Sequence, residues 1–562
     1  METTQNKGSG LKKGALILVF SSAIVKIISA LFKIPLASDL CLGDLGFGYF
    51  SSAHDVFTPI YFITVSGFPV AISHLVADFV AKGNLHAVKQ TLSASKKLLF
   101  MLGFASVVLY LICIYPFVIF TDKTGNSIYS FLAVTPTIIF CLWSACYRGY
   151  YEGLSNMRPA AISCVIEALG KLFLGLGFAL IVVLLNGNIA YASAAAIVGI
   201  SLGTLFSALY LRMKYKRNDG LEGFEETVLS EPISQKSIMK TLLKISLPIV
   251  AASLSNSLVA LIDGLTVRYQ LSNLFINNPD EMLTLYSRLI GEIESKSSEM
   301  VSLDVLPTVL YGIRSKAFTL FNLIPTLTMS IGVGLIPEVT ASFSKGDKTS
   351  LKSNVSAAIK LSSLICIPAG FGYIFFGERI MTLLYGNGAS SQLGGNMLIY
   401  YGIAAIFAGF SLPLASILQA IGKQSAAFIN VLCGILLKII LNIVLCNIYE
   451  INIYGSVYST VACFILIFLL HAICIIKNIG FLNDVLNSFL KPLFAAVLCI
   501  AAGYCVSVIS VSSLFTAFTI ITAVVVYLIL LIVFKALDAS DLLALPMGDK
   551  LLKLFKRAKF IK

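Results

Sequence analysis

Apolar residues occur in about fourteen runs, most of them near the roughly 20 residues that an α-helix needs to cross a bilayer. Short polar connections separate the runs. This pattern predicts an all-α polytopic membrane protein with about fourteen transmembrane helices. The predicted spans are 14–38, 47–77, 98–120, 128–148, 159–185, 189–211, 242–268, 305–340, 355–377, 396–420, 425–447, 453–476, 490–510 and 513–535. The second and eighth are long for one crossing, so we expect each to project a helical turn or two beyond the bilayer.

Composition agrees with a membrane protein and argues against a nucleic-acid partner. The chain is 57% hydrophobic and 12% charged, and its mean hydropathy is +0.90, which leaves too little polar surface for a soluble protein of this length. The net charge of +13 is concentrated in the termini and in alternate connections, as in membrane proteins, instead of forming one basic patch. The twelve cysteines lack metal-ligand spacing and are interpreted as small packing residues.

The distribution of Lys and Arg predicts the orientation of the chain. Cations are concentrated at both termini and in the connections after the second, sixth and eighth spans, whereas the intervening connections are poor in them. By the positive-inside rule, both termini are therefore expected in the cytoplasm, with the spans in the cell membrane. The segment 269–304 is then the one long connection outside, and it is net acidic.

A weak internal repeat predicts two halves. Lys82, Gly83 and Lys89 follow the second span, and Lys345, Gly346 and Lys352 follow the eighth with the same spacing. Six spans separate the two loops, so the halves have the same orientation, and parallel repeats of this kind are typical of transporters. The alternative is chance similarity of two basic amphipathic loops. The expected organisation is an N-terminal six-helix lobe (1–213), a cytoplasmic linker (214–241), a C-terminal six-helix lobe (242–476) and two appended spans with a basic tail (477–562).

A few charges lie inside the predicted spans, where an ionisable side chain usually marks a functional site. Lys26 and Lys33 are seven residues apart in the first span, hence on one helical face and about 10 Å apart along the axis. We interpret them as a cationic wall of a central cavity that suits a phosphate-bearing head group. The alternative is pairing with a buried carboxylate, of which Asp55 and Asp263 are the candidates.

Further charges extend this set. Arg268, at the end of the seventh span, and Arg314 and Lys316, in the eighth, either line the same cavity or anchor the helices at the interface. Glu167 and Lys171 are four residues apart and favour an internal ion pair. Lys438, in the eleventh span, has no evident partner nearby in the sequence and is the better candidate for the substrate pathway. His54 and Asp55 are candidates for carrying a proton or cation, or for an interface role.

Catalytic patterns are missing from the sequence. It contains no Walker A, HExxH or GxSxG motif and no large cytoplasmic segment that could bind a nucleotide. We therefore expect neither an enzyme nor an ATP-driven pump, and we predict no metal and no cofactor.

Several motifs resemble those of one family. Arg148-Gly149-Tyr150-Tyr151-Glu152-Gly153, with Met157, Pro159, Ser163 and Glu167 after it, resembles the RGYFQG-x-x-x-M-x-P-T-A-x-S-x-x-x-E pattern of the stage V sporulation protein B and polysaccharide transporter family. The other stretches that carry the resemblance are Lys26 to Pro35, Gly67 to Ser73, Leu261 to Asp263 with Arg268, Tyr311 to Pro325 and Leu418 to Lys423.

The resemblance implies membership of the multidrug/oligosaccharidyl-lipid/polysaccharide superfamily and two six-helix lobes around a cationic cavity, to which Lys26 and Lys33 would contribute. Relatives flip lipid-linked sugar precursors, lipid II of peptidoglycan among them, and the sporulation members act in building the spore cortex. The chain departs from the family pattern at Glu152, Arg314 and Lys316 and in its longer 269–304 loop.

The predicted function is translocation of a polyprenyl-pyrophosphate-linked sugar precursor by alternating access, with membrane lipids and a coupling Na⁺ or H⁺ as further partners. The alternatives are a drug/cation antiporter of the same superfamily, which would favour a carboxylate-dominated cavity, and a non-transporting scaffold for cell-wall synthesis.

Overall fold

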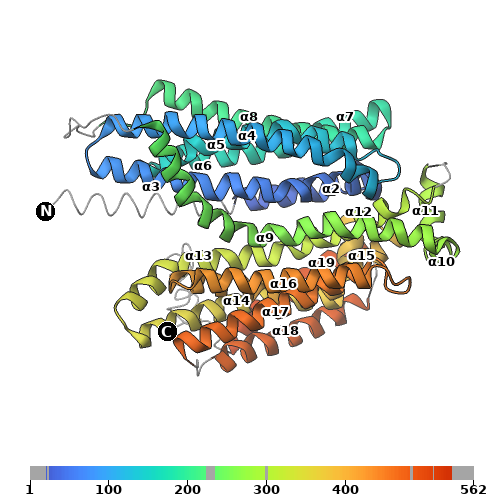
Figure 1. Ribbon diagram of the computed structural model, residues 1–562. Coiled ribbons are helices and arrows are strands. Elements are labelled where there is room, and N and C mark those ends of the chain that lie inside the picture. Colours follow the sequence, from blue (N-terminus) through green and yellow to red (C-terminus); the bar gives the residue numbers. More distant parts are fainter. Residues whose placement is uncertain are drawn as a thin grey trace. The chain divides into compact units, whose positions relative to one another are not determined.

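The computed structural model describes residues 21, 24–222, 234–297, 302–480, 485–509 and 512–534, and every regular element in these ranges is a helix (Figure 1). Ten of the described helices are long and apolar enough to cross a membrane, and Phe68–Ala81 and Phe515–Leu531 are shorter apolar helices. The predicted all-α, multi-pass membrane architecture is therefore confirmed. Among these residues the helices that meet the length and hydropathy requirements are fewer than the fourteen predicted spans, the first of which begins outside the described ranges.

The helices form two compact units. Unit 1 contains the chain up to Phe275 and the short segment Ser302–Gly312; unit 2 contains Ile276–Val301 and the chain from Ile313 onward. The last predicted span of the first lobe ends at residue 211, but most of the following long helix also belongs to unit 1. The appended C-terminal helices belong to unit 2. The lobe boundaries taken from the repeat stay a prediction.

Unit 1 is built around two neighbouring helices rich in small residues. Its elements are helix 24–36, α2 (Gly43–Phe62), η1 (Ile63–Gly67), α3 (Phe68–Ala81), α4 (Leu85–Thr121), α5 (Ile128–Gly153), α6 (Met157–Gly170), η2 (Lys171–Gly175), α7 (Leu176–Asn186), α8 (Ile189–Arg217) and most of α9 (Gln235–Asn277). Helices α5 and α8 pack extensively against each other. Ser130 and Ser193 are hydrogen-bonded 2.7 Å apart between them, and Thr137 and Ser201 2.5 Å apart. Small hydroxyl residues let helix backbones approach closely and join them where no water is present.

Two of the predicted spans contain a π-helical segment. The predicted span 47–77 consists of α2, η1 and α3, and the predicted span 159–185 consists of α6, η2 and α7. A π-helical turn inserts an extra residue into the helix and is frequent at functional sites. In this chain η1 directly follows Phe62 and η2 begins at Lys171, two residues that border the same cavity.

Unit 2 consists of α10 (Pro279–Leu285), α11 (Ser287–Ser297), most of α12 (Leu306–Phe321), α13 (Leu323–Ser344), α14 (Lys348–Tyr385), α15 (Ala389–Ala420), α16 (Gln424–Leu445), α17 (Tyr454–Ile479), α18 (Val485–Ser507) and α19 (Ser513–Val533). Helices α14 and α15 pack together over most of their length, and α18 and α19 pack on each other and on α14. The long predicted span 305–340 is two helices, because α12 ends at Phe321 and α13 begins at Leu323.

The acidic segment 269–304 is largely helical in its described part. The Tyr286 hydroxyl, after α10, donates to the Asn452 side chain at 2.6 Å. From α11, Arg288 donates to Gln392 at 2.9 Å, and the Glu292 carboxylate accepts the backbone N–H of Ala389. Because Ala389 is the first residue of α15, whose own N-cap residue is a glycine, Glu292 supplies the missing cap. The segment is thus fastened to unit 2.

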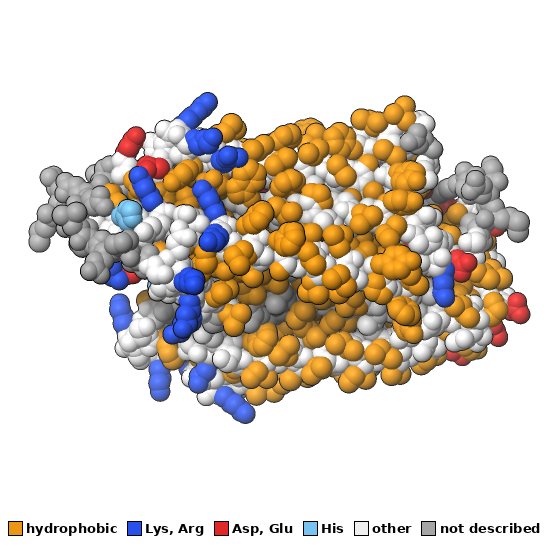
Figure 2. Space-filling view, turned by 45° about the horizontal axis from the view of Figure 1, so that its top comes forward, with side chains coloured by type: hydrophobic (Ala, Val, Ile, Leu, Met, Phe, Trp, Pro, Cys, Tyr) orange, Lys and Arg blue, Asp and Glu red, His pale blue; other side chains and the backbone are white. Residues whose placement is uncertain are grey.

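Many large apolar side chains of the described helices are exposed. Figure 2 shows a broad hydrophobic band on the face in view, with Lys and Arg side chains gathered along one edge of it. Helix α4 exposes a row of large apolar residues on its surface, namely Phe100, Met101, Phe104, Leu109, Ile112, Tyr115, Ile119 and Phe120. Exposed rows of this kind fit a hydrocarbon environment and would be unfavourable in water.

Candidate functional site

A cavity of about 170 Å³ lies inside unit 1. It is lined by Ser29, Phe32, Lys33, His54, Phe57, Thr58, Tyr61, Phe62, Val134, Thr137, Lys171, Ile197 and Ile200. These residues come from helix 24–36, α2, α5, η2 and α8. At about 30 Å³ per molecule the space accommodates roughly six water molecules, and it is below the roughly 300–1,000 Å³ of drug-sized pockets. It therefore suits one phosphate group or one sugar ring at a time.

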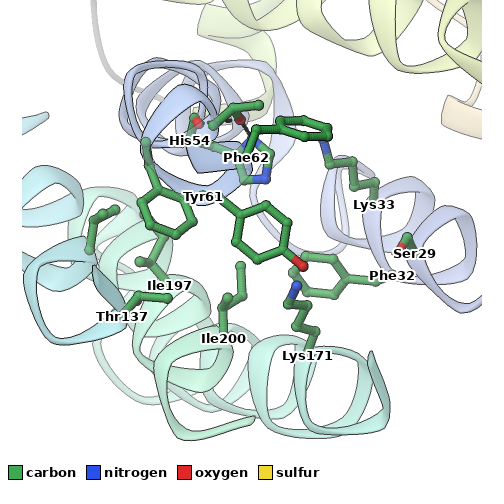
Figure 3. Close-up of a pocket in the computed structure, with 13 residues that line it drawn as sticks. Ser29, Phe32, Lys33, His54, Tyr61, Phe62, Thr137, Lys171, Ile197 and Ile200 are labelled. Atoms are coloured by element: carbon green, nitrogen blue, oxygen red, sulfur yellow. Dashed lines mark hydrogen bonds between the residues drawn. The ribbon is translucent and has the colours of Figure 1, made fainter. Parts of the chain in front are cut away.

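Helix geometry brings the lining of α2 together. His54, Phe57, Thr58, Tyr61 and Phe62 recur at intervals of three and four residues, so they share one face of the helix. Figure 3 shows the labelled side chains converging from separate helices, with Lys33 and Lys171 as the ammonium groups among aromatic rings. The Lys171 ammonium lies 5.1 Å from the centre of the Tyr61 ring, a cation–π distance.

A buried ion triad stands behind Lys171. One oxygen of Glu167, Oε1, lies 2.8 Å from Lys171 Nζ, and the other, Oε2, lies 2.8 Å from Arg148 Nη2. The Tyr61 hydroxyl also donates to Oε1 at 3.3 Å. Arg148 is held in place by Ser163 at 2.9 Å and Ser207 at 3.0 Å. The triad carries two positive charges and one negative charge.

Asp55, next to His54 on α2, does not line the cavity, and its carboxylate accepts the Tyr311 hydroxyl at 2.7 Å. His54 Nδ1 lies 3.2 Å from the Thr58 hydroxyl, which itself donates to the His54 carbonyl at 2.7 Å. Because that hydroxyl proton is already used, the imidazole is the donor at Nδ1. Lys33 lies within electrostatic range of Asp55 and Lys171. Counted together, Lys33, Lys171 and Arg148 outnumber Asp55 and Glu167 by one positive charge.

The remaining charges predicted in unit 1 lie elsewhere. Lys26 is half-buried on the helix of Lys33 but does not line the cavity, and Asp263 is buried. Arg268 is fully buried, with its Nη2 atom 3.4 Å from Asp122 Oδ2 and 3.0 Å from the Thr308 hydroxyl. In this structure Arg268 therefore belongs to a buried ion pair that joins α9 to the loop after α4.

Three predicted cations are buried in unit 2. The Arg314 guanidinium lies 4.4 Å from the centre of the Phe318 ring, and the Lys316 ammonium 5.0 Å from that of Tyr385. Lys438 is fully buried and donates to the Thr460 hydroxyl at 2.6 Å. Lys438 also lies 3.4 Å from the Ser459 hydroxyl and from the Ser456 carbonyl. The three cations do not line the cavity of unit 1, and a role for them in binding substrate stays a prediction.

Sequence reasoning did not assign a site role to Arg148, Tyr61 or Asp122. Arg148 stands in the motif that carries the family resemblance, so its place in the sequence was a signal. Tyr61 belongs to the aromatic face of α2, which the three-to-four-residue periodicity could have revealed. Asp122 gave no signal, because its partner Arg268 is distant along the chain.

A helical, multi-pass membrane fold with a cationic, aromatic-lined cavity is the architecture of a membrane transporter. Comparison with known proteins is specific about the kind. Residues 11–273 match the family model described as "Polysaccharide biosynthesis protein", and residues 313–444 match the MatE family model.

Curated relatives cover most of the chain. Lipid II flippase MurJ of Bacillus subtilis (strain 168) is 24% identical over 510 residues, which are 88% of each chain. Stage V sporulation protein B of the same organism is 26% identical over 475 residues, 83% of each chain. A solved structure of lipid II flippase MurJ in an inward closed conformation superposes with a TM-score of 0.63 at 15% identity, covering 92% of this chain and 98% of that one.

The chain is thus similar to the polysaccharide-biosynthesis family over residues 11–273, to the MatE family over residues 313–444, and to curated flippase and sporulation relatives over most of its length. It is a transporter related to lipid II flippase MurJ and to stage V sporulation protein B, and not an enzyme. The family resemblance and the all-helical transporter fold expected from the sequence are confirmed.

Proposed function

We propose that this chain is a flippase that moves a polyprenyl-pyrophosphate-linked sugar precursor across the cell membrane by alternating access. The observation that supports this most is the chemistry of the cavity in unit 1. Lys33 and Lys171 place two ammonium groups in it, and the described residues that line it include no Asp or Glu. A phosphorylated head group would bind the ammonium groups while the polyprenyl chain stays in the lipid.

The aromatic residues in the lining add to this fit. Phe32, Phe57, Tyr61 and Phe62 present flat apolar faces next to the ammonium groups. Aromatic faces of this kind pack against the apolar side of a sugar ring, while amphipathic groups such as the Tyr61 hydroxyl can bond its polar edge. The relatives point in the same direction, since one is named a lipid II flippase.

The main alternative is a drug/cation antiporter, and the observation that supports it is the MatE match over residues 313–444. A cationic drug would require a carboxylate facing the cavity. In the described part of unit 1, Asp55 is bonded to Tyr311 and Glu167 is shared by Arg148 and Lys171. The cavity charge therefore favours an anion. A non-transporting scaffold for wall synthesis is the other alternative, and the relatives' names favour transport over it.

The topology that goes with this proposal has both termini in the cytoplasm. It is supported by the distribution of Lys and Arg along the chain. The precursor would then be loaded from the cytoplasmic side, and either a Na⁺ or H⁺ gradient or the membrane potential would drive the cycle.

The test is translocation in proteoliposomes that contain the purified full-length protein and a fluorescent polyprenyl-pyrophosphate-linked sugar. Replacing Lys33 by Gln removes one charge-assisted hydrogen bond to the phosphate, worth about 1.5–3 kcal/mol, so translocation should fall roughly 10- to 150-fold. Lys82→Gln, which changes an exposed lysine on a surface ion pair, is the control and should leave the rate unchanged. The companion variant K26A/K33A should abolish translocation.

Two results would count against the proposal. Undiminished translocation by well-folded K33Q and K26A/K33A would place the head group elsewhere. Transport of cationic dyes with no movement of the lipid-linked sugar would favour the antiporter, and neither binding nor transport of the precursor would favour the scaffold.

A further inference from the structure

The most informative feature beyond the cavity itself is that two of its donors, Lys171 and Tyr61, already share an acceptor. Glu167 Oε1 lies 2.8 Å from the Lys171 ammonium and accepts the Tyr61 hydroxyl at 3.3 Å. Both Lys171 and Tyr61 line the cavity, whereas Glu167 does not. The carboxylate thus binds, from behind the wall, the same two donors that an anionic head group would use from the front.

The second oxygen of Glu167 is bound differently. Oε2 lies 2.8 Å from Arg148 Nη2, and Arg148 is anchored by Ser163 and Ser207, away from the cavity. The Arg148 side chain is almost fully buried and comes from α5, whereas Glu167 comes from α6. A buried carboxylate that loses its partner is strongly destabilised. Glu167 would avoid this cost if Lys171 left it, because Arg148 would still neutralise the carboxylate.

Lys171 has the freedom to change partners. Its side chain is 24% exposed, against 4% for Glu167 and 5% for Arg148. It is also the first residue of the π-helical segment η2, where the regular hydrogen-bond ladder of the helix is interrupted. An ammonium group has three donors on a flexible stem, so it can turn from one oxygen to another without moving the backbone.

We infer that Lys171 is a switchable ligand: it is paired with Glu167 when the cavity is empty and turns to the phosphate of the head group when the cavity is filled, while Arg148 is the positioning residue that keeps Glu167 neutralised in both states. The inference rests on the proposed function, because it requires an anionic head group in this cavity. Glu167 then acts as an internal competitor that lowers affinity and assists release.

The switch predicts opposite changes in ligand affinity when Glu167 or Lys171 is replaced. Removing the charge of Glu167 with the isosteric E167Q frees Lys171, so the affinity for a prenyl pyrophosphate should rise by about tenfold, within the usual range of coupling between two sites. Lys171→Gln should lower affinity by roughly tenfold or more. The double variant E167Q/K171Q should bind nearly as weakly as K171Q alone, because only the Tyr61 hydroxyl is then left for Glu167 to compete for.

A matched variant distinguishes the release of Lys171 from the effect of a changed net charge on binding. E167Q adds one positive charge to the cavity wall, but E167Q/R148M removes one charge of each sign and keeps the net charge of the wild type. Tighter binding by this double variant reports release of Lys171 and not a change in net charge. It also serves as the test if E167Q alone does not fold, since it leaves no uncompensated arginine.

The experiment is equilibrium binding of radiolabelled farnesyl pyrophosphate to the full-length protein in detergent, with D78N as the control. Asp78 and Lys82 form an i,i+4 pair like Glu167 and Lys171, at 2.7 Å but exposed, so D78N should bind like the wild type. In the translocation assay E167Q should lower both KM and kcat, since tighter binding slows release. A purely structural role of the triad would not produce this combination.

The outcomes separate the two levels of the proposal. If K33Q and K171Q weaken binding but E167Q and E167Q/R148M do not strengthen it, the switch is wrong and the anion site stands. If neither K33Q nor K171Q weakens binding, the proposed function fails with the switch.

Discussion

Replacing Asp122 by Asn should destabilise unit 1 more than any exposed charge change. Asp122 and Arg268 are both fully buried, with Arg268 Nη2 3.4 Å from Asp122 Oδ2. Arg268 Nε and Nη1 have no hydrogen-bond partner among the described residues. In D122N the guanidinium would remain buried with only the Thr308 hydroxyl and an amide nearby, which is an uncompensated charge.

The magnitude follows from the burial. Breaking a buried ion pair by removing one partner costs about 3–5 kcal/mol. If each kcal/mol lowers the melting temperature by about 2–4 °C, as in domains of comparable size, the loss is roughly 6–20 °C. The exposed pair of Asp78 and Lys82 contributes about 0–1 kcal/mol, so D78N should shift melting by only a few degrees at most.

The assay is thermal unfolding of the purified protein in one detergent, monitored by far-ultraviolet circular dichroism. D122N/R268M, which removes both charges, should recover most of the lost stability, because an apolar replacement of a buried pair is often neutral. A D122N protein that melts like D78N, or a double variant as unstable as D122N, would refute the reasoning.

The same pair has a pH dependence. Burial by itself would raise the pKa of Asp122, but Arg268 and the hydrogen bonds from Ser127 and Thr124 outweigh it and hold this pKa below its ordinary value of 3.8. The stabilisation is therefore present above pH 3.8 and is lost as the pH falls through the lower, folded-state pKa. The difference in melting temperature between wild type and D122N should shrink in that acidic range. A difference that stays constant down to that range would contradict the assignment.

Other predictions concern packing and topology. A Cβ at Gly312 would lie 1.9 Å from the Asp44 carbonyl oxygen, so G312A should fail to give monodisperse protein, while normal yield and melting would contradict this close approach. Tyr286→Phe removes the bond to Asn452, so stability should fall by about 1 kcal/mol and proteolysis near α10 should increase, and unchanged proteolysis would contradict the docking of this segment. A protease site fused to either terminus should be cut in inside-out vesicles only, and cutting in right-side-out vesicles would reverse the proposed orientation.

Local spacing was sufficient to predict part of the site. Lys171 follows Glu167 by four residues, so a helix brings them together whatever the rest of the chain does. The structure places their charged atoms 2.8 Å apart. Hydropathy likewise predicts helices, because the length of an apolar run is set by the bilayer and not by neighbouring helices.

Contacts between distant segments were beyond the sequence. Arg148 reaches Glu167 only because α5 packs beside α6. Asp122 reaches Arg268 only because the fold of unit 1 brings α9 beside the loop after α4. The π-helical segments were equally hidden, since hydropathy does not distinguish a π turn from an α turn. The break at Asn322, which divides the predicted span 305–340 into α12 and α13, was also hidden, because it leaves the apolar pattern unchanged.

The most direct test of the central claim is to map where the head group lies. A lipid-linked sugar with a photoreactive group next to its pyrophosphate would be cross-linked to the wild-type protein in liposomes and located by mass spectrometry. The account predicts labelled residues on helix 24–36, α2 or η2, with the label lost in K33Q/K171Q. Labelling that misses these elements, or that persists undiminished in the double variant, would contradict it.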